Sequence, residues 1–350
     1  MSPRTIVTDA RADAEARLHA TLRFAVGITA AFVACEYLQL APSFLAPVLV
    51  GVLLANLPMR PTLKMGVMLV LTMAAAALFS FAMASLLRGT PFVLFGLIGV
   101  CMFIAFHGLV SGRPALPFIL LLICLTTIPV IVMVAPAQAA ALPTALVRSI
   151  ALALVTIWIV YLPWSLAPPP APPPPAAQSI ATPEARALLS TAVVMPVMLV
   201  YLLFGLADVL PVLIGTMILV INFDLESGRK QAWARILANF AGGLFAFLLH
   251  AVLLTTPSLP FLALLLFPVL LGFGQRIAAG GPAASVAVVA CNAMLIIFSS
   301  AIASGPGSLS LWLTRLFQFT LAGAFAVAMM HLVWHRVFLR YATPPTTATR

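Results

Sequence analysis

The sequence predicts an all-α polytopic membrane protein, with about twelve transmembrane helices in two parallel six-helix repeats joined by a Pro-rich cytoplasmic linker. Three observations support this fold class. Hydrophobic residues make up 63% of the 350 residues and charged residues 7%, whereas soluble domains carry roughly 25% charged residues. Apolar stretches of about 20 residues, the length that crosses a hydrocarbon core as a helix, recur along the whole chain. Finally, several stretches of the first half have counterparts in the second.

Apolar runs bounded by Pro, Gly and charged residues define the predicted spans. Residues 1–17 form a polar cytoplasmic segment, and the span after them lacks a small-residue cleavage site, so we expect it to be retained. The first repeat covers 18–163, the linker 164–182, the second repeat 183–338 and a cytoplasmic tail 339–350. The twelve predicted spans are 18–38, 42–58, 65–87, 91–111, 115–135, 142–163, 183–205, 207–222, 231–254, 257–275, 282–303 and 308–337.

The distribution of Lys and Arg predicts the orientation, because positively charged loops stay on the cytoplasmic side. With the N-terminus inside, fifteen Lys or Arg residues fall in cytoplasmic segments or adjoining span ends, against Arg88 in an outside loop. Both termini are therefore expected in the cytoplasm. This topology also explains the net charge of +10, so we expect contact with membrane lipid and none with nucleic acid.

The linker contains the run APPPAPPPPAA at 167–177. Proline cannot continue a helix, and such a run adopts polyproline II with a rise of about 3.1 Å per residue. We expect a semi-rigid strap between the two half-bundles. A docking site for a proline-binding module is the alternative.

All four cysteines lie within apolar spans and show no CxxC or Cys/His spacing. Such residues are expected to be small buried apolar side chains. A disulfide between Cys101 and Cys124 is the alternative for that pair. The pattern predicts neither a metal site nor a cofactor, and the four residues are Cys35, Cys101, Cys124 and Cys291.

The two halves share short stretches in the same order. LAPVLVG at 45–51 nearly returns as VLPVLIG at 209–215, and Arg148 in the sixth span has a counterpart in Arg315 in the twelfth. With two further pairs, the offsets are 164, 169, 168 and 167 residues, which is the drift that a few inserted loop residues produce. Because each half has six spans, the copies share one orientation, as in transporters built from parallel repeats. The seam between them is the expected substrate route.

Arg148 and Arg315 are the sharpest candidates for function, because a cation inside the membrane needs compensation. One interpretation is that both guanidinium groups bind an anionic substrate, since their planar donors suit a carboxylate. The other is that each pairs with an acid at similar depth, Glu36 or Asp208. Both can hold if a substrate carboxylate displaces the acid, which then takes up a proton; alternatively, the acids stay ionised in wet vestibules.

Two histidines are further candidates for proton coupling, because histidine titrates near physiological pH. His107 lies near the inner end of the fourth span and His250 toward the outer end of the ninth. Hydrogen bonding at a helix end is the alternative for each. His331 and His335, four residues apart on the last span, are expected to contact lipid phosphate rather than a metal.

Proline and glycine recur together in the second and eighth spans. Pro47 and Pro211 each remove a helical donor, and Gly51 and Gly215, four residues later, allow close backbone approach. Bent or broken spans of this kind can line a substrate pathway. Packing kinks are the alternative.

The stretch PVLIGTMILVINFDLESGRKQAWARILANFAGGLFAFLL at 211–249 resembles the fusaric acid resistance and aromatic acid exporter superfamily. In that family a span ends in a polar loop, followed by an arginine and a glycine-bearing helix, here Arg235, Gly242 and Gly243. Residues 42–115 are similar to a short, uncharacterised branch of the superfamily that lacks the large cytoplasmic domain. The resemblance implies a bacterial inner-membrane exporter of aromatic carboxylic acids, driven by proton-motive force. It also implies a periplasmic membrane-fusion adaptor and an outer-membrane channel as partners.

We therefore expect a secondary exporter of small organic anions and no enzyme. The chain lacks a GxxxxGK[ST] nucleotide-binding loop and paired membrane carboxylates. A major-facilitator transporter is a weaker alternative, because PMRPTLKMG between the second and third spans lacks that family's GxxxDRxGRR-like pattern. The other alternative is a non-transporting channel or scaffold subunit of an efflux assembly. The sequence leaves homo-oligomerisation open.

Overall fold

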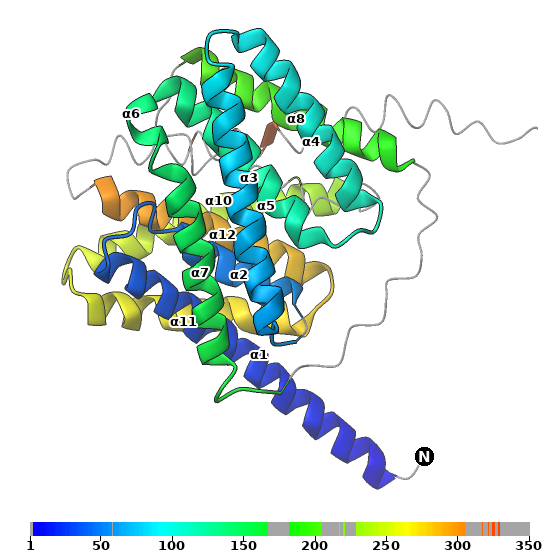
Figure 1. Cartoon of the computed structure of the whole chain (residues 1–350). Coiled ribbons are helices and arrows are strands. Elements are labelled where there is room, and N and C mark those ends of the chain that lie inside the picture. Colours follow the sequence, from blue (N-terminus) through cyan, green and yellow to red (C-terminus); the bar gives the residue numbers. More distant parts are fainter. Residues whose placement is uncertain are drawn as a thin grey trace, which may run out of the picture.

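A computed structural model of the chain describes residues 3–57, 59–166, 182–204 and 229–304, together with single residues of two further stretches. Over these ranges the chain is helical and contains no strand, which confirms the all-α class (Figure 1). Nine of the described helices are long and apolar enough to cross a membrane. The helices are α1 (Pro3–Tyr37), α2 (Leu45–Asn56), α3 (Leu63–Leu86), α4 (Pro91–Val110), α5 (Ala115–Val134), α6 (Pro136–Ala139), α7 (Leu142–Val160), α8 (Pro183–Phe204), α10 (Arg229–Leu253), α11 (Leu259–Ala279) and α12 (Pro282–Ser304).

The predicted spans and the observed helices agree closely where both exist. Nine predicted spans coincide with the nine long apolar helices. The span predicted at 42–58 is shorter than expected, because α2 has 12 residues and is therefore about 18 Å long, against a hydrocarbon core of about 30 Å. The spans predicted at 207–222 and 308–337 lie outside the described residues, as does most of the Pro-rich linker.

Pro47 does not break α2, contrary to the role that its position within the predicted span suggested. It is the third residue of the helix, and the first N–H groups of a helix have no intrahelical partner to lose. The chain before Leu45 is not helical, so the predicted span loses its first three residues rather than bending.

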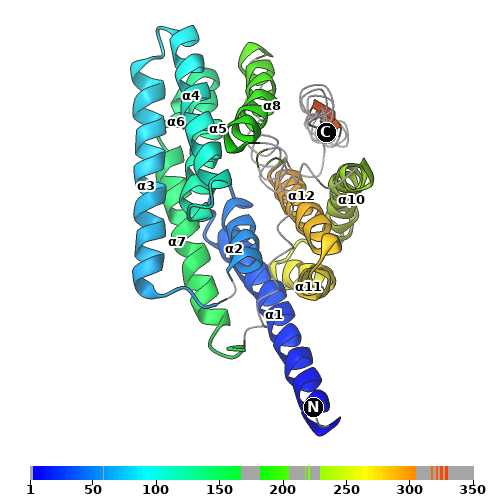
Figure 2. The same cartoon turned by 90° about the vertical axis from the view of Figure 1, so that its right-hand side faces the viewer.

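The packing divides the helices into two groups (Figure 2). In this view α3, α4, α5 and α7 stand on one side and α10, α11 and α12 on the other, with α2 between them. Within the groups, α3 packs on α5 and α7, and α10 packs on α12. Between them, α1 packs on α11, and α8 packs on α4. The first helix of each half therefore packs against the helix at the fourth predicted span of the other half, 91–111 or 257–275.

Small residues allow the closest of these approaches. A Cβ added at Gly242 of α10 would collide with the carbonyl oxygen of Ala290 in α12, and one at Gly274 of α11 would lie 3.0 Å from the carbonyl oxygen of Thr21 in α1. Backbone obstacles of this kind cannot rotate away. Such small-residue contacts are typical of helices that associate in a membrane.

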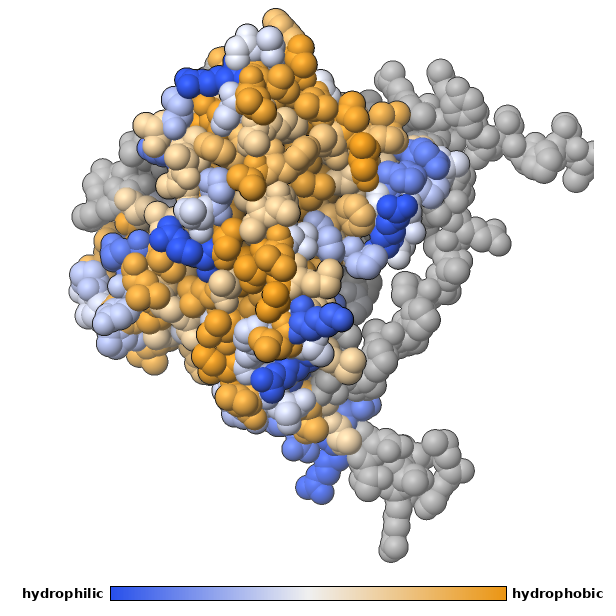
Figure 3. Space-filling view, viewed as in Figure 1, coloured by the Kyte–Doolittle hydropathy of each residue, from blue (hydrophilic) through white to orange (hydrophobic). Residues whose placement is uncertain are grey.

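The outer surface is largely apolar, as expected of a protein that faces lipid. Figure 3 shows hydrophobic residues covering the middle of this face, with hydrophilic residues gathered in smaller groups. Large apolar side chains are exposed on several helices, for example Phe92 at 91% and Leu203 at 72%. By contrast, α5 and α12 have 72% and 78% of their apolar windows buried. These two helices form the centres of the two groups.

A buried arginine joins the middle of α1 to the chain that follows α7. Arg23 is 3% exposed, and its Nη1 donates to the carbonyl oxygens of Trp164 and Leu166 at 2.5 and 2.6 Å. Its guanidinium carbon lies 4.3 Å from the ring centre of Tyr161. Arg23 thus makes specific contacts with three residues at this end of the bundle.

Candidate functional site

A cavity of about 950 Å³ opens at the end of the bundle where α1 and α12 finish and α2 and α7 begin. This volume is in the range of small-molecule binding sites, about 300 to 1,000 Å³. Short α6 and the last turn of α5 complete its wall. Because α1 and α5 end here while α2 and α7 start here, the cavity collects the residues of a single end of the membrane bundle.

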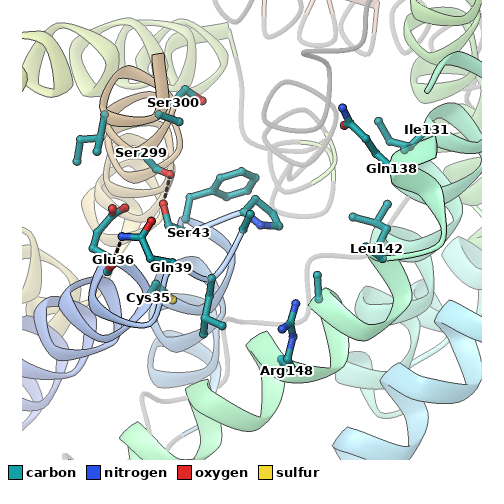
Figure 4. Close-up of a pocket in the computed structure, with 18 residues that line it drawn as sticks. Cys35, Glu36, Gln39, Ser43, Ile131, Gln138, Leu142, Arg148, Ser299 and Ser300 are labelled. Atoms are coloured by element: carbon teal, nitrogen blue, oxygen red, sulfur yellow. Dashed lines mark hydrogen bonds between the residues drawn. The ribbon is translucent and has the colours of Figure 1, made fainter. Parts of the chain in front are cut away.

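The segment between α1 and α2 closes one side of the cavity through two polar contacts. Nε2 of Gln39 donates to the carbonyl oxygen of Glu36 at 2.8 Å, which folds the segment back onto the end of α1. The hydroxyl groups of Ser43 and Ser299 lie 2.8 Å apart and share a hydrogen bond, drawn in Figure 4. The second contact joins the start of α2 to the end of α12.

The cavity brings together two of the predicted functional residues, Arg148 and Glu36. They lie on different walls, Glu36 on α1 and Arg148 on α7 (Figure 4). Arg148 is the seventh residue of the 19-residue α7, a third of the way along the helix. Its side chain is exposed in the cavity rather than enclosed by protein.

Neither charge has a counter-charge among the described residues. The structure shows no ion pair between Arg148 and Glu36, and the ion pair found in the described part of the chain lies elsewhere. One carboxylate oxygen of Glu36, Oε1, is buried without a hydrogen-bond partner. The pairing of Arg148 with Glu36 that the sequence offered as an alternative is therefore not present in this structure.

The remaining wall combines amide and hydroxyl groups with apolar side chains. Gln138 of α6 and the serines of α12 supply polar atoms, and Ile131, Leu142 and Phe44 supply apolar surface. A guanidinium that is free to bind and an apolar wall fit a ligand with a carboxylate at one end and a ring or short chain at the other. Glu36 on the opposite wall, with one carboxylate oxygen that lacks a hydrogen-bond partner among the described residues, adds an acidic group to the cavity.

Pro47 and Gly51 lie in α2, deeper in the bundle than the cavity, and do not line it. Pro47 is buried in the first turn. A Cβ added at Gly51 would lie 3.2 Å from Cδ1 of Ile28 in α1 and 3.9 Å from Oδ1 of Asn292 in α12. Gly51 therefore marks the meeting point of three helices.

The two predicted histidines lie away from the cavity. Nε2 of His107 is 3.6 Å from Oε1 of Glu184, a contact between the end of α4 and the start of α8 that is an ion pair when the histidine is protonated. The ring of His107 stacks on Phe103 with ring centres 6.2 Å apart. His250 lies on α10, where its Nδ1 is buried without a partner in the described part of the structure. The helix-end interpretation thus fits His107 better than a place at the substrate site.

Four predicted site residues lie outside the described residues. They are Arg315, Asp208, Pro211 and Gly215, the second-half counterparts or neighbours of the residues above. The matched pair of guanidinium groups therefore stays a prediction.

The four cysteines are free thiols, as expected. Cys35, Cys124 and Cys291 are buried and Cys101 is partly so. No group of three His, Cys, Asp or Glu residues suited to a metal ion occurs in the part of the chain that the structure describes.

A second, smaller hollow of about 570 Å³ lies between α10, α11 and α12. Alanines and two phenylalanines, Phe245 and Phe273, form most of its wall, and Arg276 stands at its edge. The sequence had indicated none of these residues as functional. Fewer polar side chains line this hollow than line the cavity that contains Arg148.

Comparison with known proteins supports a membrane protein and no finer class. Residues 20–162 match a family of membrane proteins that is described as Protein of unknown function (DUF2955). The matched segment corresponds to the first predicted repeat, so the first half of the chain is similar to that family. No curated protein and no solved structure matches the chain.

Sequence reasoning missed the neutral polar residues of this region. Gln138, Ser43 and Ser299 looked like ordinary loop or helix-end residues, and their convergence depends on how distant helices pack. Asn292 is the polar residue that the sequence could have indicated, because it is a lone amide in the middle of the apolar stretch 282–303.

Proposed function

We propose that the protein is a bacterial inner-membrane secondary transporter that exports small organic anions, in the first place aromatic carboxylic acids. The observation that carries this proposal is the cavity in which Arg148 and Glu36 face a common space without pairing. A chain with nine apolar membrane-length helices in its described part and such a cavity has the parts of a transport site.

Arg148 acts as the anion-binding group in this proposal. Its planar guanidinium donates two parallel hydrogen bonds to a carboxylate, while the cargo's ring packs against Leu142 and Ile131. Glu36 acts as the proton carrier. A cargo carboxylate bound in the same cavity places a second negative charge near Glu36, which favours the protonated form of Glu36 and so couples export to proton entry.

The packing supports the proposed duplication into two parallel six-span repeats. α3 packs on α5 as α10 packs on α12, and α4 packs on α5 as α11 packs on α12. The first helix of each half also packs on the other half in an equivalent way, α1 on α11 and α8 on α4. This correspondence is expected if the halves share an ancestor and the chain has twelve spans, with Arg315 as the partner of Arg148.

The distribution of Lys and Arg gives the proposal its orientation. With both termini in the cytoplasm, the cavity opens toward the periplasm, because α1 runs outward and ends there. A periplasmic adaptor of the membrane-fusion type and an outer-membrane channel are the partners that suit a cavity on this side.

The test is transport by the purified protein in proteoliposomes. We expect radiolabelled benzoate to cross the membrane, and to do so faster when the face that bears the cavity is the more acidic one. Empty liposomes give the background. Movement that ignores the pH gradient would indicate a channel, and absence of movement with folded protein would indicate a scaffold subunit.

A further inference from the structure

The middle of α12 carries a polar group for which the fold provides no partner. Asn292 is 4% exposed, and its Nδ2 is buried without a hydrogen-bond partner among the residues that the structure describes. Asparagine in membrane helices ordinarily hydrogen-bonds across to a neighbouring helix. An amide donor that is buried but unused is costly to maintain in a membrane, so a structural role does not explain it.

Asn292 lies directly inward of the cavity on the same face of its helix. It precedes Ser299 by seven residues, which is two helical turns, or about 10 Å along the axis. Ser299 lines the cavity and holds Ser43. As the eleventh residue of the 23-residue α12, Asn292 stands at the midpoint of the helix, the depth at which transporters bind their cargo.

The neighbouring helix α2 lies against the amide at a glycine. Gly51 of α2 faces Asn292, with 3.9 Å between Oδ1 and the place where a Cβ would be. Ser43 contacts Ser299 at the cavity, and Gly51 contacts Asn292 nearer the middle of the bundle. Because the residue numbers rise along one helix and fall along the other, α2 and α12 are antiparallel and stay side by side between these two levels. The absence of a side chain at residue 51 lets α2 approach both Ile28 of α1 and the amide of Asn292 at this depth.

The same pattern occurs on α1. Thr29 is 8% exposed, and its Oγ1 is buried without a partner in the described part of the chain. It lies seven residues inward of Glu36, on the same face of α1. Two helices that reach the cavity thus each carry an unpartnered polar group two turns below it.

We infer that Asn292 is a second binding position for the cargo's carboxylate, at mid-membrane, between the cytoplasm and the cavity of Arg148. This inference rests on the proposed function and adds a residue and a location to it. Nδ2 donates to a carboxylate oxygen as the anion passes α2 beside Gly51. The cargo then moves outward along α12 by about 10 Å, to the level of Ser299, where it reaches the cavity that Arg148 lines.

The decisive experiment compares Asn292→Leu and Asn292→Ala with the full-length protein in proteoliposomes, with benzoate as the probe. Thr127→Val is the matched control, because Thr127 is fully buried in α5 and its Oγ1 already donates to the carbonyl oxygen of Ile123 at 2.7 Å. We expect both Asn292 variants to lose about tenfold in transport rate, the size of effect that a lost hydrogen bond to a charged group produces. The control should transport like the wild type.

Two further readouts separate a transport role from a structural one. In detergent, the Asn292 variants should bind benzoate at the Arg148 cavity with wild-type affinity, measured by the ligand-induced rise in Tm. Their own Tm should equal or exceed that of the wild type, since an unused buried donor has been removed. A structural amide would instead lower the Tm.

The outcomes distinguish the two proposals. If the wild type moves benzoate and both variants move it at the wild-type rate, Asn292 is not a binding position, and the proposed transport function is unaffected. If both variants fail to fold, the amide has a structural partner and the second position is again wrong. If the wild type binds benzoate without moving it, transport itself is overturned and the mid-membrane position with it.

Discussion

Glu36 and Arg148 line the same cavity from two different helices, and no ion pair joins them. Opposite charges that share a cavity without pairing leave the cation available to an external anion. This relationship is the basis of the first two predictions below, because it assigns different tasks to the two charges.

Arg148→Ala should lower both benzoate binding and transport by about tenfold or more, since a hydrogen bond to a charged group contributes about 1.5 to 3 kcal/mol. Arg148→Lys should retain part of the affinity, because a lysine keeps the charge and loses the bidentate geometry. The measurements are ligand-induced Tm shifts and proteoliposome uptake. Arg88→Ala is the matched control, an exposed arginine near the same end of the bundle that does not line the cavity. Equal loss in the control would show a general effect of charge.

Glu36→Gln should abolish the response to a pH gradient while leaving downhill transport in place. The amide keeps the shape of the carboxyl group and cannot take up a proton, so the coupling is lost and the cation remains. Uptake at equal pH and under an imposed gradient measures the two separately. Glu184→Gln, which changes an acid at the His107 contact, should stay gradient-sensitive. If the Glu36→Gln variant still responds to the gradient, a residue other than Glu36 carries the proton.

Gly242→Ala should destabilise the protein severely, because the added Cβ meets the carbonyl oxygen of Ala290 on the neighbouring backbone. Overpacking of this kind costs about 1 to 3 kcal/mol, and more where nothing can move. Gly272→Ala is the control, since a Cβ there meets nothing within 4 Å and alanine favours a helix. Thermal unfolding in detergent should give a lower Tm for the first variant and an unchanged or higher one for the second.

Arg23→Ala should destabilise the protein by about 2 to 3 kcal/mol, because the carbonyl oxygens of Trp164 and Leu166 lose a charged donor and stay partly buried. Arg17→Ala removes an exposed arginine from the preceding turns of α1 and should change little. Unfolding midpoints of both variants test the difference. Similar midpoints would mean that the Arg23 contacts do not hold α1 to the chain after α7.

Hydropathy predicted the helices well, because each membrane-length helix must be apolar over most of its own length, wherever it packs. Hydropathy did not predict where α2 begins. Residues 42–44 are compatible with a span by composition, yet Ser43 bonds to Ser299 and the helix begins at Leu45. This contact to a residue far along the chain holds Ser43 just before the first turn of the helix.

The candidate site was predictable in part. Arg148 and Glu36 stood out because a charge in an apolar stretch is costly and therefore conspicuous. His107 stood out because histidine titrates near physiological pH, but its contact is with Glu184 at the start of α8 and not with a residue of the cavity. Gln138 and Ser299 did not stand out, since uncharged polar residues are common near helix ends.

By itself, the sequence determined an all-helical membrane protein, the positions of most of its long helices and two of the charges at its cavity, because hydropathy and isolated charge are local properties of the chain. The tertiary structure decided which of those charges meet, which polar groups remain without partners and how far α2 extends. These properties depend on contacts between residues as distant in the chain as Gly51 and Asn292, and no local pattern records which helices will lie side by side.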